Sequence, residues 1–536
     1  MAIFFVACES VSEPEVTPTP TRTPRPPTPT LTPMPSPTPT PAWPVTASCG
    51  GGVPAEVCDR LRQAVAQDPE HLAWVDDPAV ADVQLGTEAL PDTRPFATWV
   101  YALVAPFFTL EDEVSAAELE ATWTGQPAGP FVQHPLLVST DTQRALPLGS
   151  PAGGVELVEA SRVLTEAMER DAWAIVPFHR LEPRWKVLHL DGVSPLDRGL
   201  DLEAYPLATS LYLGTEERSD ALSLLPGAST NRDPERMTVV MMTGVTALTR
   251  GTARTMEREG VTYPARDVRE WLVEPDITHV SNEVSFAEDC PVPPAQSTLV
   301  FCSDLSYFDL LAHVDTDVLE LTGNHLLDWG VSAMERSLKL YEERDLPFFG
   351  GWWNLEQARQ PLTRTSGVHT FGFLGCNPIG PSYVWATDER PGAAPCDYDL
   401  LAAQVRELRE RGMIPIVTFQ YLEVDQYAPT ARQQADFRAV AEAGAAIVSG
   451  SQAHWPQGFE FHAGSFIHYG LGNLFFDQMQ RLEYRQEFLD RHVFYDGRHV
   501  STELLTAMLE DYARPRPMTP EERRLLLEAT FAESGW

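Results

Sequence analysis

Four polar residues in the second half of the chain follow predicted strands and carry the chemistry of a hydrolytic site. They are Glu283, Asn324, His325 and His454. Carboxylate, amide and imidazole groups bind divalent cations, and histidine also exchanges protons near neutral pH. We therefore expect one cleft in which His325 and His454 are catalytic, while Glu283 and Asn324 contact the substrate or a metal.

Each of these residues taken alone also has a purely structural explanation. The Gly-Asn-His sequence at 323–325 can form a turn in which Asn324 adopts a left-handed backbone and His325 caps a helix. His454 precedes Trp455 and can be a packed, hydrogen-bonded histidine. Because all four residues recur after strands, the arrangement favours a shared site over four unrelated ones.

Alternating strand and helix patterns support this placement. Apolar runs predict strands, and apolar residues spaced at i, i+3 and i+4 predict helices. We expect strands at 237–245, 277–280, 317–321, 371–374, 414–419, 445–449 and 466–469, and helices at 331–343, 400–411, 431–443 and after Thr519. Open α/β sheets bind ligands at the carboxyl ends of their strands, which is where the polar residues fall.

The region 48–228 also has an α/β pattern. Strands are expected at 82–86, 97–108 and 173–178, and helices at 115–123 and 155–170. Ser115 and Glu118 fit a capping box at the start of the first helix. The segment 229–236 is polar, contains Asp-Pro, and predicts a linker to a second domain at 237–536.

The first region resembles periplasmic solute-binding proteins of the phosphate type. The likeness is carried by VYALVAPF at 100–107, VSAAELEATWTG at 114–125 and AIVPFHRLEPRWKVLHLDG at 174–192. The resemblance implies a small α/β domain, and no binding residue is carried over with it. Two roles stay open for this domain: a scaffold for the second domain, or a sensor of a small oxyanion such as phosphate.

The second region resembles the CapA family of capsule and poly-γ-glutamate synthesis proteins. The matching pieces are TGVTALTRG at 243–251, SNEVSF at 281–286, GNHLLDWG at 323–330, IVTFQ at 416–420, GAAIVSGSQAHWPQ at 444–457 and YGLGNLFFD at 469–477. The resemblance implies a metallophosphatase-like αββα sandwich, followed by a C-terminal helical tail. The residues at family-type positions are Glu283, Asn324, Asp328, His325, His454 and Asn473.

Three positions depart from the family pattern. Val245 replaces the aspartate after the first strand, Gln420 replaces a histidine, and Ser451 replaces the first histidine of Gly-His-x-x-His. Valine cannot bind a metal, and amide or hydroxyl oxygens are poorer ligands than carboxylate or imidazole for transition metals. We therefore do not expect a standard dinuclear centre, although one divalent cation can still bind through Asn324, His454 and Glu283.

Two functions follow from the resemblance. The first is a CapA-type cell-surface protein in capsule, poly-γ-glutamate or exopolysaccharide synthesis or assembly, with a degenerate metal site and with the polymer or its synthesis machinery as partner. The alternative is an active metal-dependent hydrolase that cleaves a phosphoester or amide in a surface polymer. In both, Gln420, Ser451, Asp328 and Asn473 line the cleft.

The N-terminal segment predicts membrane attachment outside the cytoplasm. Residues 1–8 resemble a shortened lipoprotein signal with a lipobox, which implies a lipid on Cys8 as the only membrane contact. Residues 9–47 are rich in Pro and Thr and predict a disordered, extended spacer. The other six cysteines fall into local pairs, and we expect disulfides 49–58, 290–302 and 376–396. Unpaired thiols in a cytosolic protein are the alternative.

The charge of the chain restricts its partners. Its 536 residues include 76 Asp and Glu against 39 Lys and Arg, a formal net charge of −37. Nucleic-acid binding is excluded, because phosphate recognition needs a basic face. An acidic polymer such as poly-γ-glutamate should be repelled unless divalent cations bridge it to the protein, and a neutral polysaccharide fits the charge better.

Overall fold

The structure is a computed structural model that describes residues 44–88, 90, 92–216, 218–227, 229–291 and 299–536. Residues 44–536 form one compact unit. The expected lipid attachment at Cys8 and most of the spacer at 9–47 lie outside the described residues. Among the described residues, no helix is both long and apolar enough to cross a membrane.

The first part of this unit is built on a mixed sheet with the main strand order β2-β1-β3-β11-β4-β8-β6-β7. The strands are β1 (Val45–Cys49), β2 (Leu72–Trp74), β3 (Val83–Gly86), β4 (Asp92–Pro106), β6 (Leu136–Val138), β7 (Val155–Leu157), β8 (Trp173–Pro177) and β11 (Ala208–Thr215). Strand β4 pairs with β11 along its first half and with β8 along its second half, so it joins two halves of the sheet. The helices of this part are α1 (Ala55–Gln67), α2 (Ala116–Trp123), α3 (Thr140–Ala145) and α4 (Val163–Arg170).

The α/β pattern of this region is confirmed, with one shortened helix. Helix α2 begins after Ser115, and the expected capping box with Glu118 is present. The helix expected at 155–170 is wrong in its first half, because Val155–Leu157 form strand β7 beside β6 and the helix begins only at Val163. An edge position in the sheet overrides the helical spacing of these residues.

The segment 229–236 returns to the first sheet. Strand β12 (Ser229–Thr230) pairs with β4. The side-chain amide of Asn231 accepts a hydrogen bond from the backbone N–H of Val100 at 2.8 Å and donates one to its carbonyl at 2.8 Å. The polar composition that predicted a linker is therefore used to hold the chain against β4.

The second part contains two sheets. A nine-stranded sheet has the main order β19-β18-β15-β13-β29-β30-β31, with β14 beside β15 and β28 beside β14. A six-stranded sheet has the order β21-β22-β24-β25-β27-β26. The first comprises β13 (Met237–Thr243), β14 (Val245–Thr246), β15 (Ile277–Asn282), β18 (Val318–Glu320), β19 (Phe348–Phe349), β28 (Asn473–Phe475), β29 (Gln486–Tyr495), β30 (Arg498–Glu510) and β31 (Arg514–Pro517). The second comprises β21 (Leu362–Ser366), β22 (His369–Cys376), β24 (Ile414–Phe419), β25 (Ile447–Ser449), β26 (Phe459–His462) and β27 (Ser465–His468).

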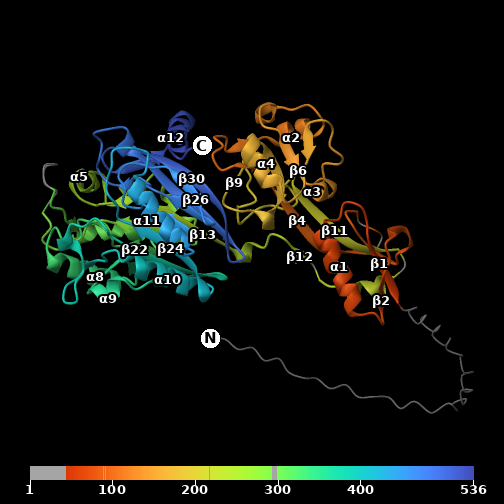
Figure 1. Ribbon diagram of the computed structural model, residues 1–536, viewed down its shortest axis with the longest axis horizontal. Helices are drawn as coiled ribbons and strands as arrows, with labels where there is room; N and C mark the ends of the chain where they lie inside the picture. The colour runs from red at the N-terminus through yellow and green to blue at the C-terminus, as the bar shows by residue number, and fades with distance from the viewer. Residues whose placement is uncertain (1–43, 89, 91, 217, 228, 292–298) are drawn as a thin grey trace, which may run out of the picture. The chain divides into compact units, whose positions relative to one another are not determined.

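Three apolar layers show that these sheets form an αββα sandwich. Val240 of β13 packs between the sheets with Phe371 and Ile416, whereas its neighbour Met241 faces outward. The outer face of the nine-stranded sheet is covered by α5 (Arg250–Glu259), α6 (Arg269–Val273), α7 (Phe308–His313) and α8 (Val331–Glu343). Helices α10 (Tyr398–Glu410) and α11 (Ala431–Glu442) cover the outer face of the six-stranded sheet (Figure 1). The expected fold class is confirmed.

The C-terminal region is more than the helical tail that the sequence predicts. Strands β29 and β30 form a long hairpin that completes the nine-stranded sheet, and only then does α12 (Pro520–Glu533) begin, capped by Thr519 as expected. Strand β29 is buried throughout, yet it carries polar residues such as Asp490 and His492 toward the space between the sheets. Its sequence therefore lacks the apolar alternation that marks a half-buried strand.

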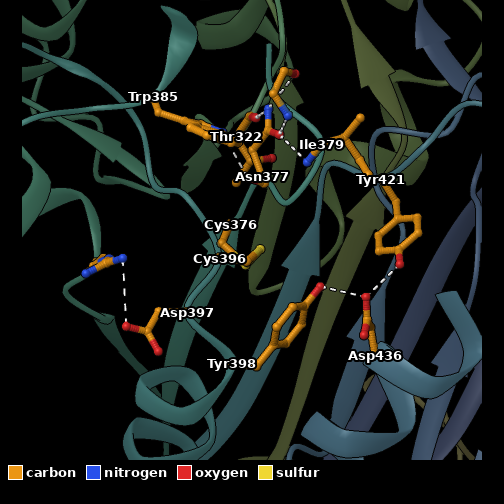
Figure 2. The surroundings of a disulfide bond; sticks show 12 residues. Thr322, Cys376, Asn377, Ile379, Trp385, Cys396, Asp397, Tyr398, Tyr421 and Asp436 are labelled. Atoms are coloured by element: carbon orange, nitrogen blue, oxygen red, sulfur yellow. Dashed lines mark hydrogen bonds and ion pairs between the residues drawn. A yellow bond between two sulfur atoms is a disulfide. The ribbon is translucent and has the colours of Figure 1, made fainter. Parts of the chain in front are cut away.

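All three expected disulfides are present. They join Cys49 to Cys58, Cys290 to Cys302 and Cys376 to Cys396. The last one ties the end of β22 to the residues just before α10, on the side of the sandwich that carries the candidate site (Figure 2).

Candidate functional site

The predicted site residues meet at the carboxyl ends of neighbouring parallel strands. Strand β14 pairs with β15 on one side and with β28 on the other, so Val245 lies opposite Ser281 and Asn473. Glu283 follows β15, and an isolated bridge between Val284 and His325 holds the Gly-Asn-His turn beside it. Gly323 is needed there, because a Cβ atom would lie 2.7 Å from the Cα of Glu283.

A carboxylate and imidazole cluster forms the centre of the site. The Nε2 atom of His454 lies 4.0 Å from a carboxylate oxygen of Glu283 and 3.7 Å from one of Glu423. Ligand atoms of the three residues all lie within 4.8 Å of one another. Glu283 is fully buried, and neither of its carboxylate oxygens has a hydrogen-bond partner among the described residues. A buried carboxylate without partners is costly, so this one favours a cation as its partner.

The electrostatics of Glu283 reflect the same surroundings. Burial raises the pKa of Glu283 above its ordinary value, while the nearby imidazoles of His325 and His454 act in the opposite direction. Both histidines therefore lie close enough to Glu283 to influence its ionisation. This places them in one site with the glutamate.

Asn473 fixes the orientation of His454. The amide nitrogen of Asn473 donates to the carbonyl of Tyr484 at 2.8 Å, so its carbonyl oxygen faces the Nδ1 atom of His454 at 2.7 Å. Because that oxygen can only accept, Nδ1 carries the proton. In the neutral imidazole, the Nε2 lone pair then points to the two glutamates, as a metal ligand requires.

His325 and Asp328 form a second pair at the site. The Nδ1 atom of His325 donates to Asp328 at 2.6 Å, and the His325 ring packs against Phe301 with centroids 4.3 Å apart. Burial by itself would lower the pKa of His325, but the hydrogen bond to Asp328 and the charge of Glu283 raise it above the ordinary value. His325 is therefore a partly exposed imidazole that is held ready to carry a proton.

Glu423 is a site residue that the sequence analysis missed. It lies in the loop after β24, and its side chain is 45% exposed. The Tyr421 hydroxyl anchors this loop by donating to Asp436 at 2.6 Å, a carboxylate that also accepts from Tyr398 at 2.8 Å (Figure 2). The sequence contained a signal for Glu423, because this carboxylate follows a predicted strand and comes shortly after Gln420, which the family resemblance already placed in the cleft.

The loop that follows β18 is held in place by Asn377, which follows β22. The side-chain amide of Asn377, next to the Cys376–Cys396 disulfide, donates to the carbonyl of Thr322 at 3.0 Å (Figure 2). Thr322 directly precedes the Gly-Asn-His turn. The carbonyl oxygen of Asn324 in that turn is buried and has no partner among the described residues. This atom is the side-chain amide oxygen Oδ1, so it is free to accept from a ligand.

The positions that depart from the family pattern point elsewhere or are apolar. Val245 packs in an apolar cluster with Val284, Phe301 and Phe476. Ser451 donates its hydroxyl to the buried Glu320, away from the Glu283 cluster. Gln420 is buried, and its amide oxygen has no partner among the described residues.

Three of these side chains could hold one divalent cation. Glu283, Glu423 and His454 supply two carboxylates and one imidazole, which suits a single ion. The second half of a dinuclear centre would need a bridging carboxylate and further ligands where Val245 and Ser451 stand.

The residues of the candidate site lie in a region that matches a known protein family. Residues 239–478 match the family described as "Bacterial capsule synthesis protein PGA_cap". This part of the chain, called the PGA_cap region below, is similar to that family. The PGA_cap region thus includes every site residue described above, from Val245 to Asn473.

Two curated relatives are similar to part of this chain. The PGA biosynthesis protein CapA of Bacillus subtilis (strain 168) is 28% identical over 171 residues, 32% of this chain and 45% of the relative. The capsule biosynthesis protein CapA of Bacillus anthracis is 26% identical over 257 residues, 46% of this chain and 62% of the relative. The chain therefore spans about half the length of the curated relatives it matches.

A solved structure is also similar to part of this chain. An ABC-type phosphate transport receptor from Vibrio cholerae aligns with 34% of this chain and 92% of its own, at 16% identity and a TM-score of 0.29.

Proposed function

We propose that the PGA_cap region holds one divalent cation and uses it to bind an acidic polymer during capsule or poly-γ-glutamate synthesis. The proposal rests on one observation. The buried carboxylate of Glu283 has no hydrogen-bond partner among the described residues, and it faces His454 and Glu423. When bound there, the cation supplies a positive charge that carboxylate or phosphate oxygens of a polymer can approach.

The net charge of the chain supports a cation-dependent mode of binding. At a formal charge of −37, the protein repels polyanions over most of its surface. A divalent cation at Glu283 and Glu423 would neutralise the two carboxylates and present a local positive centre to an anionic ligand. Polymer contact should therefore be confined to the cleft, and chelation should abolish it.

The proposed setting is the outer face of the cell membrane. A lipid on Cys8 and the spacer at 9–47 would hold the described unit away from the bilayer. The three disulfides are in keeping with an oxidising compartment. The polymer or its synthesis machinery is the proposed partner.

Metal binding and polymer binding can be measured separately. Calorimetry of the purified full chain with Mn²⁺ or Zn²⁺ should give about one site, and a poly-γ-glutamate pull-down should lose its signal in EDTA. Glu283→Gln should weaken cation binding at least ~10-fold. Glu487→Gln is the matched control, because Glu487 is also a fully buried glutamate without partners among the described residues, but lies outside the cluster. Polymer binding that survives EDTA would refute the proposal.

A second candidate function is hydrolysis of a phosphoester or amide bond in the polymer. The His325–Asp328 pair favours it, because this imidazole can donate a proton to a leaving group beside Glu283. Turnover of bis-p-nitrophenyl phosphate or γ-glutamyl-p-nitroanilide in Mn²⁺ should then fall at least ~100-fold in His325→Ala. Turnover that is unaffected by His325→Ala would eliminate this candidate.

A further inference from the structure

A separate cavity of about 690 Å³ lies in the first part of the unit. It is bordered by the start of α1, by the start of α3 and by the residues that follow β8. This volume is within the range of small-molecule sites in proteins. None of its lining residues belongs to the Glu283 cluster.

The N-terminus of α1, which borders this cavity, is already occupied by an anion. The backbone N–H of Ala55, the first residue of the helix, donates to the carboxylate of Asp141 at 3.1 Å. Glu56 adds a second acidic residue in the first helical turn. Because the helix dipole favours negative charge at this end, Asp141 takes the place that a free oxyanion would need. The resemblance to phosphate-type binding proteins therefore does not extend to the ligand.

Most of the charged groups around the cavity neutralise one another. Glu56 accepts from Arg180, and its other carboxylate oxygen lies 2.7 Å from the Nε2 atom of His179. The Asn231 amide lies 3.3 Å from the Nδ1 atom of His179, so Nδ1 accepts and Nε2 carries the proton toward Glu56. Glu182 and Arg184 form another pair. These groups have little free charge to offer a ligand.

Two residues of opposite charge remain. Asp141 and Arg498 line the same cavity, and both residues are exposed, so a ligand can reach them. Among the described residues, the Arg498 side chain donates a single hydrogen bond, from Nη2 to the carbonyl of His179 at 2.7 Å. Asp141 accepts through one carboxylate oxygen, from the Ala55 N–H, and its second oxygen has no hydrogen bond to a described residue. The cavity thus offers one carboxylate and one guanidinium that form no ion pair with a described residue.

We propose that this cavity binds a zwitterion, a free amino acid or a short peptide, with its ammonium group on Asp141 and its carboxylate on Arg498. Guanidinium binds carboxylate with charge-assisted hydrogen bonds, and a carboxylate does the same for an ammonium group. A ligand with only one of these charges leaves the other residue unpaired. The inference is independent of the cation site and of the polymer.

Calorimetry on the full chain tests this with defined probes. Glycine, L-glutamate and glycylglycine should bind, and their relative affinities distinguish a free amino acid from a peptide. Acetate, methylamine and inorganic phosphate should each bind at least ~10-fold more weakly, because each satisfies at most one of the two charges. Phosphate binding tighter than that of every zwitterion would overturn the proposal, as would no zwitterion binding at ~10 mM, a weak affinity for any specific site.

Charge-removing variants locate the site. Asp141→Asn keeps an acceptor for the Ala55 N–H and should weaken zwitterion binding at least ~10-fold, as should Arg498→Met. Arg498→Lys should restore part of the affinity. The controls are Glu159→Gln and Arg406→Met, at exposed residues outside the cavity that form no ion pair with any described residue. Equal loss in variants and controls, or unchanged binding in Asp141→Asn and Arg498→Met, would show that the cavity is not the site.

Discussion

The imidazole of His454 lies 3.7 Å from the carboxylate of Glu423, a residue on the loop after a different strand. Glu423 is 45% exposed, so it can be changed with little effect on folding. Glu423→Gln should lower Mn²⁺ affinity at least ~10-fold, because it removes one of two carboxylate ligands. Isothermal titration measures this, with the exposed Asp388→Asn, outside the cluster, as control. Equal affinity in the wild type and Glu423→Gln would remove Glu423 from the site.

The second prediction concerns the replaced family ligands. The triple change Val245→Asp, Gln420→His and Ser451→His supplies a carboxylate and two imidazoles, which transition metals prefer. It should raise the metal content from about one to about two equivalents. Mass spectrometry of the metal in dialysed protein measures the ratio, and circular dichroism checks that the variant is folded. A folded variant that still holds one equivalent of metal would show that these three replacements are not what limits the site to one cation.

A buried network takes the place of a ligand at Ser451. Glu320 accepts from Ser451, from His279 at 3.0 Å and from Thr322 at 2.5 Å, and all four side chains are buried. Burial alone would raise the pKa of Glu320, but these hydrogen bonds lower it. Glu320→Ala should cost about 3 kcal/mol in the free energy of unfolding, because it leaves His279 buried without its acceptor. Ser451→Ala should cost about 1 kcal/mol. Urea denaturation followed by near-UV circular dichroism compares them, and equal midpoints would refute the network.

The Cys376–Cys396 disulfide should matter for both stability and the site. It closes a loop with a sequence separation of 20, so Cys376→Ser with Cys396→Ser should cost about 3 kcal/mol. The freed loop includes Asn377, which holds the carbonyl of Thr322 ahead of the Gly-Asn-His turn. Cation affinity should therefore fall together with the melting temperature. A serine variant that melts like the wild type would show that the bridge constrains nothing.

One buried histidine, His492, and one half-buried histidine, His499, predict a loss of stability in acid. Burial lowers the pKa of His499 to about 3 and that of His492 well below its ordinary value. His492 Nε2 and His499 Nδ1 have no hydrogen-bond partner among the described residues, and His468, which is hydrogen-bonded to Asp490 at 2.6 Å, also acts on His492. Between about pH 6.5 and pH 3 the unfolded chain binds more protons than the native one, so stability is full above this window and falls as the pH decreases.

The slope of the free energy of unfolding against pH identifies which groups cause the loss of stability in acid. Each such histidine should contribute up to ~1.4 kcal/mol per pH unit to the free energy of unfolding. His499→Gln should therefore give a flatter pH dependence between pH 6 and pH 4, as measured by urea unfolding at each pH. The same slope in the wild type and the variant would mean that other groups cause the acid loss.

Local sequence patterns determined much of the fold. Strand β24 and helix α8 begin and end at the residues that their apolar spacing predicted, and the caps at Ser115 and Thr519 are present. These features depend on neighbours a few residues apart, which a sequence displays directly. The hairpin of β29 and β30 was missed, because its polar residues are paired or buried by strands far away in the chain.

Residue type and position after strands also predict Glu283, His325 and His454 as site residues, and the structure brings these three side chains together. The tertiary structure decided which groups meet. It added Glu423, gave Asn473 the task of orienting His454, and directed Ser451 to Glu320. The physical reason is that side-chain direction and burial depend on how two sheets pack, and no local pattern records the distance between loops from different strands.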